Sequence, residues 1–339
     1  MLYPRSPLFE RLHAEIAAMP VIDCHEHLRG PAGRPPYKEP IAALINGYVL
    51  SDLQSAAQGV PATDIARLSD PDVATDVKWP LFKRLWRATE HTAYARVTKL
   101  VLRDVYGEAE LTREALERVA ARLAAQDEAA YFRTLDEAGI RMMVADSLAG
   151  WFGDNSLRNW LDGKHQFPSK WRPMIPLPDL HPTTFSMGNV DWLASLVDCS
   201  ITSLDDYARA MATLCERCKA RGAVGIKDQS AYMRTLSYDL APKADAERQF
   251  NQVLADPRNT LGWPESKPLN DYLFHEGMRI AQALDLPVQL HTGHMAGIRN
   301  RVDKTNAAYL APVFELHREV RFDLFHGNWP YLGDLLFLG

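Results

Sequence analysis

Apolar and polar positions follow two different periods along the chain. Six runs of apolar and β-branched residues end in polar side chains: Val21–Leu28, Ile140–Ser147, Trp171–Leu180, Ala223–Gln229, Leu286–Thr292 and Val320–Asn328. The stretches between them carry apolar residues at helical spacing, and this alternation predicts βα units and a parallel sheet. Pro173, Pro176 and Pro178 lie in the third run, so we expect a short strand there, because proline cannot donate to a sheet ladder.

Three of the connecting segments show the helical period clearly. Thr112 to about Glu137 and Asp271–Leu284 are each expected to form one helix that returns the chain to the start of a strand. A third helix is expected after Ser203, a residue type that caps helix N-termini. Cys215 and Cys218 share the apolar face of this helix, so we predict two buried thiols and no zinc site there.

The connection between the first and second strands is unusually long. Residues 29–138 far exceed the length of a βα loop and one helix, so this segment must hold structure of its own. We expect a mostly helical subdomain at residues 29–111, acting as a lid on the C-terminal side of the sheet. Residues 1–28 and 112–339 would form the main body.

Composition narrows the class of protein. A hydrophobic content of 47% and a charged content of 24% are ordinary for a globular enzyme. The net charge of -5 and the lack of any run of five like charges argue against a nucleic-acid partner. No stretch reaches the roughly 18 apolar residues of a membrane span, and four cysteines are too few for a disulfide scaffold. We therefore expect a cytoplasmic protein with no membrane partner, and composition leaves a homo-oligomer open.

The first predicted strand ends in a His-x-His pattern. Side chains alternate between the faces of a strand, so His25 and His27 point the same way while Glu26 points the opposite way. Two imidazoles on one face can bind one metal ion, and we predict both as metal ligands. The fifth and sixth predicted strands also end in histidines, His291 and His326. Because the C-termini of parallel barrel strands converge on one face, these histidines can meet the first pair around one ion.

The fourth predicted strand ends in Lys227. A lysine at this place can be a solvated side chain, a cation that binds substrate, or, after carbamylation, an anionic bridge between two metal ions. The residues alone leave these three readings open.

The set formed by His25, His27, Lys227, His291 and His326 resembles, in residue type and order, the metal ligands of the amidohydrolase superfamily. The long insertion after the first strand, together with Ser230-Ala-Tyr-Met-Arg-Thr-Leu, looks closest to the branch that includes uronate isomerases and barrels fused to glutamine-synthetase-like proteins. The resemblance covers essentially the whole chain.

This resemblance implies a TIM-like (β/α)₈ barrel with a helical insertion after strand 1. It implies one or two divalent metal ions, usually zinc, with manganese or iron as alternatives, held by the five residues named above. Lys227 and His326 would also take part in catalysis. A bound zinc ion lowers the pKa of its water from 15.7 to about 7, which makes hydroxide available at neutral pH.

The C-terminal part of the pattern departs from the family. The family also has strands 7 and 8, with a metal-binding Asp at the end of strand 8, whereas this chain stops at Gly339. We interpret Asp334 as part of a helix after strand 6 and not as that acid. We therefore expect a barrel truncated after strand 6, with open edges that invite pairing with another chain. Weak or no hydrolysis is expected from these residues alone, in contrast to a version extended through strand 8.

Residues that follow the strand ends indicate the charge of the substrate. Arg29 and Arg234 follow strand ends, and arginine binds carboxylates through two parallel hydrogen bonds. Together with Tyr232, His294 and Trp329 they are our candidates for binding a small anionic molecule.

The favoured function is metal-dependent hydrolysis of a C–N or C–O bond in a small, carboxylated molecule. Two alternatives use the same site: isomerisation of a uronate-type sugar acid and non-oxidative decarboxylation. A third reading is a non-catalytic barrel with a regulatory or interaction role. An unmodified Lys227 beside one metal ion would leave the alternatives open, whereas a carbamylated Lys227 bridging two ions would favour hydrolysis.

Overall fold

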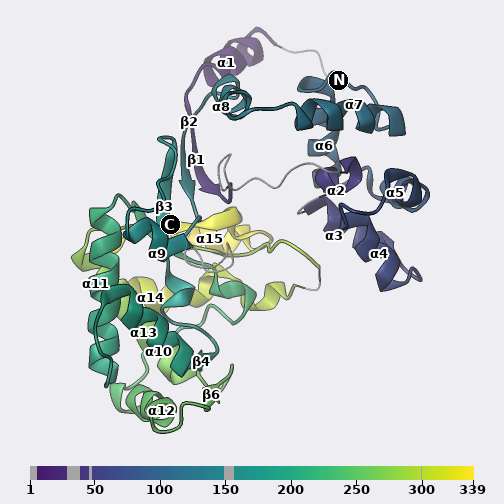
Figure 1. Ribbon diagram of the computed structural model, residues 1–339. Coiled ribbons are helices and arrows are strands. Elements are labelled where there is room, and N and C mark those ends of the chain that lie inside the picture. Colours follow the sequence, from purple (N-terminus) through teal and green to yellow (C-terminus); the bar gives the residue numbers. More distant parts are fainter. Residues whose placement is uncertain (1–5, 29–38, 46–47, 149–155, 299) are drawn as a thin grey trace. The chain divides into compact units, whose positions relative to one another are not determined.

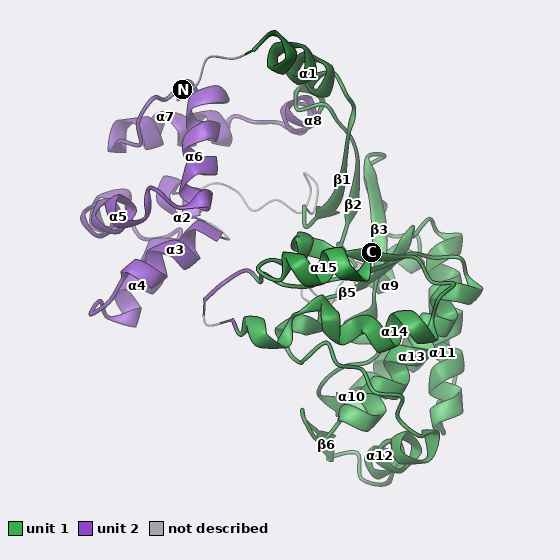
Figure 2. Cartoon of the chain, turned by 180° about the vertical axis from the view of Figure 1, so that it is seen from behind, with its two compact units in different colours: residues 1–30, 136–295, 301–339 green, residues 31–135, 296–300 purple. Residues whose placement is uncertain are grey.

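A computed structural model describes most of the chain, namely residues 6–28, 39–45, 48–148, 156–298 and 300–339. The chain divides into two compact units (Figure 2). The first contains residues 1–30, 136–295 and 301–339, and the second contains residues 31–135 and 296–300. The division predicted from the sequence, at residues 28 and 111, stays a prediction.

The first unit is built on a sheet of six parallel strands (Figure 1). In spatial order the strands are β1 (Val21–Glu26), β2 (Ile140–Ala145), β3 (Trp171–Pro176), β5 (Gly225–Asp228), β7 (Val288–Leu290) and β8 (Phe322–Leu324). Every ladder between neighbours is parallel. Each of the six runs predicted from the sequence contains one of these strands. The prediction of a short strand in the proline-rich run is wrong, because β3 has six residues, as many as β1 and β2.

The sheet curls on itself. Gln289 of β7 donates a hydrogen bond from Nε2 to the carbonyl oxygen of Cys24 in β1, at 2.9 Å. In the sheet order β7 is the fourth strand after β1, and in a flat sheet four steps of about 4.8 Å would hold these strands about 19 Å apart. One side chain can span them only because the sheet bends toward a barrel. The α/β fold with a curled parallel sheet is thus confirmed, whereas the eight-stranded barrel stays an expectation.

One helix precedes the first strand of this unit, and the others follow its strands. They are α1 (Pro7–Ala17), α9 (Ser156–Leu161), α10 (Met187–Val197), α11 (Leu204–Ala220), α12 (Lys243–Ala255), α13 (Lys267–Ala283), α14 (Ala311–Leu316) and α15 (Leu332–Leu338). Single 3₁₀ turns lie at η3 (Leu177–Asp179), η4 (Ser230–Tyr232), η5 (Val302–Lys304), η6 (Ala307–Leu310) and η7 (Phe325–Asn328), and β4 (Phe185–Ser186) pairs antiparallel with β6 (Thr260–Leu261).

The helix α11 shows how local sequence and packing agree. Ser203 accepts a hydrogen bond from the backbone N–H of Asp206, which caps the helix as its sequence predicts. The buried face carries Tyr207, Cys215 and Cys218, so the prediction of two buried thiols is confirmed. This face packs against α10 and α13. Each fully buried large side chain contributes roughly 1.5–3 kcal/mol through removal of apolar surface from water.

One predicted helix is divided into two. The segment from Thr112 to Glu137 forms α7 (Arg113–Ala124) and α8 (Glu128–Glu137) instead of one continuous helix. The side chain of Asp127 accepts a hydrogen bond from the backbone N–H of Ala130, so it begins a new helix at this point. The spacing of apolar residues is compatible with one helix. The hydrogen bond to the Asp127 side chain caps the second helix and so determines where the first one ends.

The second unit is helical. It contains α2 (Pro40–Ile45), α3 (Tyr48–Ala56), α4 (Ala62–Ser69), α5 (Thr75–Thr89), α6 (Ala93–Asp104) and α7. Its core includes Ile41, Leu53 and Phe82, all fully buried. Within it Lys78 forms an ion pair with Glu39 at 2.5 Å, and both side chains are buried. The Glu39 carboxylate also accepts from the backbone N–H groups at the start of α2, so one buried acid caps a helix and neutralises a lysine.

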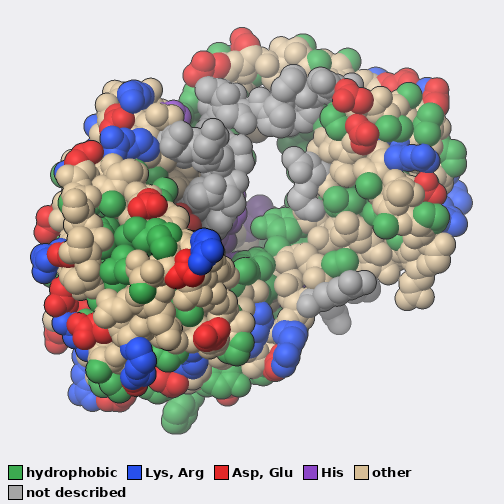
Figure 3. All heavy atoms as spheres, turned by 60° about the horizontal axis from the view of Figure 1, so that its bottom comes forward, with side chains coloured by type: hydrophobic (Ala, Val, Ile, Leu, Met, Phe, Trp, Pro, Cys, Tyr) green, Lys and Arg blue, Asp and Glu red, His purple; other side chains and the backbone are tan. Residues whose placement is uncertain are grey.

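The surface carries mixed charge. On the face drawn in Figure 3, Lys and Arg side chains lie among Asp and Glu side chains and are not gathered by sign. This agrees with the near balance of 38 basic and 43 acidic residues. Among the described residues, no helix has both the length and the apolar character that crossing a membrane requires.

Two histidines to which the sequence gave no metal-binding role form a buried pair. His275 of α13 and His317, just after α14, lie with Nδ1 and Nε2 at 2.9 Å. Burial, followed by the neighbouring His275 and Arg279, lowers the pKa of His317 to about 4. Burial also lowers the pKa of His275, although Asp271 acts in the opposite direction. One ring donates to the other, so the pair is stable only while it does not take up an additional proton.

Acid should therefore weaken the fold through this pair. The pKa of His317 in the folded chain lies below the 6.5 expected when unfolded, so between these values the unfolded chain binds more protons. The free energy of unfolding should fall as the pH drops from 6.5 to about 4, by up to about 1.4 kcal/mol per pH unit for this group. The free energy of unfolding can be measured by urea titration at several pH values in this range. When it is plotted against pH, His317→Gln should give a shallower slope than the unchanged protein. Equal slopes in the two proteins would contradict the assignment.

Candidate metal centre

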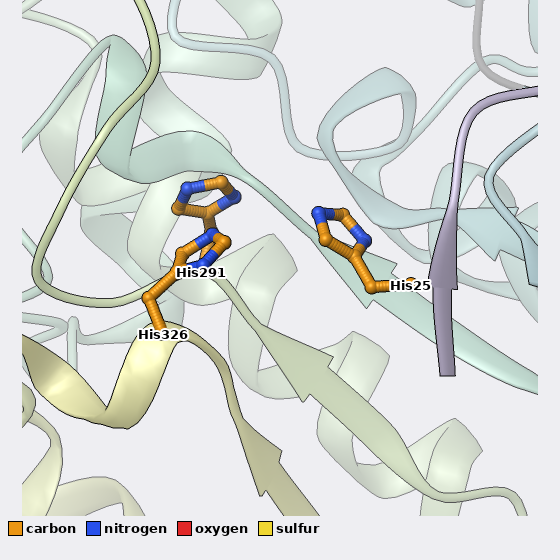
Figure 4. A group of neighbouring side chains, drawn as sticks. All are labelled: His25, His291 and His326. Atoms are coloured by element: carbon orange, nitrogen blue, oxygen red, sulfur yellow. The ribbon is translucent and has the colours of Figure 1, made fainter. Parts of the chain in front are cut away.

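Three histidines from distant parts of the chain meet at the C-terminal ends of the strands (Figure 4). His25 comes from β1, His291 directly follows β7 and His326 follows β8. One ligand nitrogen from each lies within 4.8 Å of the other two. The ring centroids of His291 and His326 are 4.4 Å apart, and that of His25 is 5.7 Å from His326. The figure shows the three rings facing a common space, with His25 opposite the other two.

His27 lies beside this group but not within it. Its ring meets the His25 ring edge to face, with centroids 4.7 Å apart. β1 ends at Glu26, whose carboxylate accepts a hydrogen bond from the His27 backbone N–H. Because His27 comes after the strand, strict alternation no longer fixes its direction. Its role as a ligand stays a prediction.

Burial keeps the histidines neutral. Burial first, and the nearby Lys227 second, lower the pKa of His25 to about 2. Burial and the neighbouring His326 lower the pKa of His291 to about 3. The pKa of His326 falls for the same reasons, burial first and Lys227 second. Neutral imidazoles keep the lone pairs that a metal ion requires.

The donor set fits a divalent metal ion. Nε2 of His291 is buried and has no hydrogen-bond partner among the described residues. A buried nitrogen without a partner is costly unless something else binds it. Imidazole nitrogen is a preferred donor for zinc, iron and copper. The orphaned atom and the three converging rings therefore suit such an ion.

Lys227 lies beside the three histidines, fully buried on β5. Its Nζ is 3.2 Å from Nδ1 of His25 and 3.5 Å from the centroid of the Phe325 ring. Burial lowers the pKa of the ammonium, although the carboxylates of Asp146 and other acids oppose this. Because it is buried, the reading of Lys227 as a solvated surface side chain is wrong.

A strained loop holds His326. His326, Gly327 and Asn328 all have positive φ values, of 59°, 55° and 54°. Such values are unfavourable for residues other than glycine, so surrounding contacts must hold them. The side chain of buried Asn328 accepts from the backbone N–H of Ala307 and donates to the carbonyl oxygen of Tyr331. These bonds fix the loop and with it the direction of His326.

The sequence analysis missed a buried acid near the lysine. Asp146 directly follows β2 and is 2% exposed, and neither carboxylate oxygen has a hydrogen-bond partner in the described part of the chain. Burial raises its pKa, while Lys227 lowers it. The signal was available, because Asp146 ends an apolar run just as His291 does. An aspartate at the end of an apolar run is a weaker indication of a metal site than a histidine there.

One of the predicted substrate-binding residues, Arg234, is not available to a substrate. Arg234 is fully buried, where its guanidinium pairs with Asp271 at 2.6 Å. It also lies over the rings of Tyr238 and Trp263. The prediction that it binds a substrate carboxylate is therefore wrong, since Asp271 already occupies that role.

The other candidates remain available as predictions. The Tyr232 ring centroid lies 4.9 Å from that of His291, and Trp329 is 62% exposed. His294 is exposed and lies close enough to His326 to lower its pKa. Arg29 falls outside the described residues. The side chain of Asp334 accepts a hydrogen bond from Asn306 and belongs to α15, which agrees with its interpretation as a helical residue.

Gly293 couples the His291 and His326 segments, and replacing it should disturb both. It has a φ of 63°, and a Cβ atom there would lie 2.4 Å from backbone atoms of Asn328 and Trp329. We expect Gly293→Ala to cost about 3 kcal/mol or more, because backbone strain and a backbone clash add. Gly107→Ala is the matched control, since its φ is 73° and no atom lies within 4 Å of the added Cβ. Chemical denaturation measures both, and equal losses would refute the close packing.

Comparisons with known proteins identify relatives of this chain in sequence and in fold. The sequence profile of the family described as Amidohydrolase matches residues 165–336. Protein fluG of Emericella nidulans is 28% identical over 146 residues, which cover 40% of this chain and 17% of that protein. The chain thus matches only a small part of this curated relative.

Solved structures with similar folds cover nearly the whole chain. The uronate isomerase of Thermotoga maritima superposes with a TM-score of 0.69 at 13% identity, covering 93% of this chain and 72% of that one. The uronate isomerase of Bacillus halodurans C-125 gives 0.65 at 14% identity, covering 96% and 70%. A protein of Lactobacillus casei ATCC 334, provisionally assigned as a metal-dependent hydrolase, gives 0.57 at 17% identity, covering 94% and 70%.

At these identities the superpositions demonstrate a shared fold and leave the reaction open. The profile match extends over half of the chain and includes the segments that carry Lys227, His291 and His326. This protein belongs to the amidohydrolase family.

Proposed function

We propose that this chain is a metal-dependent hydrolase that cleaves a C–N or C–O bond in a small, carboxylated molecule. The observation that carries the proposal is the convergence of His25, His291 and His326, whose ligand nitrogens lie within 4.8 Å of one another. Three neutral imidazoles with a face open to substrate are the donor set of catalytic zinc sites. Membership of the amidohydrolase family agrees with this chemistry.

The three histidines would hold the ion, with His27 and Lys227 as further candidates. Zinc is the first choice of metal, with manganese or iron as alternatives, and either one or two ions would fit the proposal. When bound, such an ion polarises a substrate oxygen and lowers the pKa of water.

The remaining residues would bind and orient the substrate. Tyr232 lies against His291, and exposed Trp329 follows the His326 loop. Arg29 is proposed to supply positive charge for an anionic substrate, and His294 is proposed to contact the substrate. Arg234 is no longer part of this set, because its charge is neutralised by Asp271.

Lys227 is proposed to act in one of two chemical forms. As an ammonium it would add positive charge beside the substrate. Because burial lowers its pKa, the neutral amine is also accessible, and only this form reacts with carbon dioxide. Addition would create a carbamate and release one proton, giving an anionic ligand for a second ion. The proposal is supported by the distance of 3.2 Å between Nζ and Nδ1 of His25, one of the proposed metal ligands.

Isomerisation of a uronate is the second candidate function. Two superposed folds, those from Thermotoga maritima and Bacillus halodurans, are uronate isomerases that align with more than nine tenths of this chain. A uronate carries a carboxylate, as does the substrate proposed for hydrolysis, so the same binding residues would serve either reaction. Decarboxylation and a non-catalytic role stay as hypotheses from the sequence.

The metal site can be tested without a substrate. We expect elemental analysis to find about one or two equivalents of zinc, manganese or iron per chain. His291→Ala should lose most of this metal, because it removes the central donor. His91→Ala is the control, since the His91 side chain is 86% exposed in the helical unit. A metal-replete, folded chain that binds no ion would overturn the proposal.

Substrate screening separates the two functions. Carboxylated amides, lactones and uronates should be incubated with the metal-loaded chain, and products followed by mass spectrometry. Hydrolysis of a lactone or cyclic amide gives one product 18 mass units heavier, and hydrolysis of an open-chain amide gives two products whose masses sum to that of the substrate plus 18. Isomerisation leaves the mass unchanged and is detected by chromatography. We expect hydrolysis that a chelator abolishes and added metal restores. Conversion of a uronate to its keto isomer, without hydrolysis of any compound, would instead establish the second candidate.

A further inference from the structure

Gln289 makes an unusual connection across the interior of the curled sheet. Its side-chain nitrogen donates to the carbonyl oxygen of Cys24 in β1 at 2.9 Å and to Oδ2 of Asp323 in β8 at 3.1 Å. The side chain is 6% exposed. A primary amide has two N–H donors, so each acceptor can be matched by one of them. One buried side chain therefore ties together strands β1, β7 and β8.

The strand register places this amide just below the histidines. Gln289 pairs with Lys227 of β5 on one side and with Asp323 of β8 on the other, so the three residues form a row across the sheet. His291 lies two residues farther along the chain, directly after the end of β7. Cys24, whose carbonyl accepts the bond, immediately precedes His25. The contact is thus one residue away from one metal-binding candidate and two away from another.

This position matters because of how the sheet is joined. In the described part of the chain, β1 pairs in the sheet with β2 alone, and β8 with β7 alone. The backbone path from His25 to His291 and His326 therefore runs through every intervening ladder. Small changes in twist at each ladder would add up along that path. A direct hydrogen bond across the interior fixes the distance between β1 and β7, whatever the accumulated change in twist along the ladders.

We propose that Gln289 is a positioning residue for the metal centre, holding the backbone beside His25 at the distance that lets its ring meet His291 and His326. The inference rests on the proposed metal site and identifies what sets its geometry. The Asp323 carboxylate fixes one N–H of the amide, which leaves the other directed at β1. Asp323 is a suitable anchor because it lies directly opposite Gln289 in the neighbouring strand β8 and accepts from its amide at 3.1 Å.

Removal of the Gln289 amide should weaken metal binding without abolishing it. Gln289→Met keeps the length and unbranched shape of the side chain but has no N–H donor. The three histidines remain, so metal still binds, but His25 must be drawn into place at a cost in affinity. Residues that orient metal ligands typically affect affinity about 10–100-fold when changed, and we expect a loss in this range.

The experiment measures cobalt binding to the full chain. Affinity is obtained by competition with a chromophoric chelator, and the visible spectrum of bound Co²⁺ reports its ligand geometry. Gln249→Met is the matched control, because Gln249 also bonds to backbone groups through its side chain, at Glu265 and Leu269. It should match Gln289→Met in any general loss of stability, measured by thermal unfolding with chelator present. It should keep the wild-type affinity and spectrum.

A second pair of variants serves if Gln289→Met does not fold. Asp323→Asn keeps an oxygen that accepts from Gln289 and should bind Co²⁺ within about threefold of wild type. Asp323→Ala removes that anchor and should weaken binding and alter the spectrum more than Asp323→Asn does. Asp323 is only half-buried, so both changes are tolerable.

The outcomes separate this inference from the function on which it rests. If wild type binds no Co²⁺, the metal site itself fails and the inference fails with it. If wild type binds and Gln289→Met has the same affinity and spectrum, only the inference is overturned. The same holds if Gln289→Met does not fold and the two Asp323 variants behave alike. Weaker binding with a changed spectrum, absent from Gln249→Met, supports the role of Gln289.

Discussion

Burying several basic nitrogens in one place is the constraint on which the rest of the site depends. Lys227 is fully buried, with Nζ 3.2 Å from a ring nitrogen of His25, and His291 is 5% exposed. Like charges this close in a dry environment repel strongly, so they cannot all be protonated. Neutral imidazoles are the consequence, and neutral imidazoles are metal ligands. The same arrangement explains why a buried carboxylate, Asp146, lies near the lysine. Mutual repulsion and metal binding therefore both favour the neutral form of these imidazoles.

Holding these groups together requires backbone conformations that are unfavourable by themselves. The left-handed loop at His326 is kept in place by Asn328, whose side chain is bonded to two neighbouring segments. Gly293 allows the segment after His291 to lie directly against that loop, because no side chain would fit between them. Strain of this kind persists where surrounding contacts fix it, and it is common at functional sites. The network around Asn328 is thus part of the site as much as the histidines are.

The family and fold are established more firmly than the reaction. A metal centre at the ends of parallel strands can support several chemistries, and function depends on the groups that line it. In this chain those groups include the buried carboxyl group of Asp146, the buried Lys227 and the exposed Trp329. They do not distinguish hydrolysis of a substrate from its isomerisation. The discrimination depends on where acids and bases stand relative to a bound substrate.

The sequence by itself determined the six strands, their parallel order and the histidines at their ends, because strand period and residue type are local properties. It also determined the cap at Ser203 and the buried thiols of α11. It did not determine that Arg234 would pair with Asp271, that Asp127 would divide a helix, or that Gln289 would reach β1. The Asp127 cap is a local contact with Ala130 that competes with the apolar period. The contacts of Arg234 and Gln289 depend on which residues, distant in the chain, become neighbours. The sheet's curvature brings Cys24 and Gln289 together across 265 positions, and only the tertiary structure decides such contacts, because their energies arise after the chain has closed on itself.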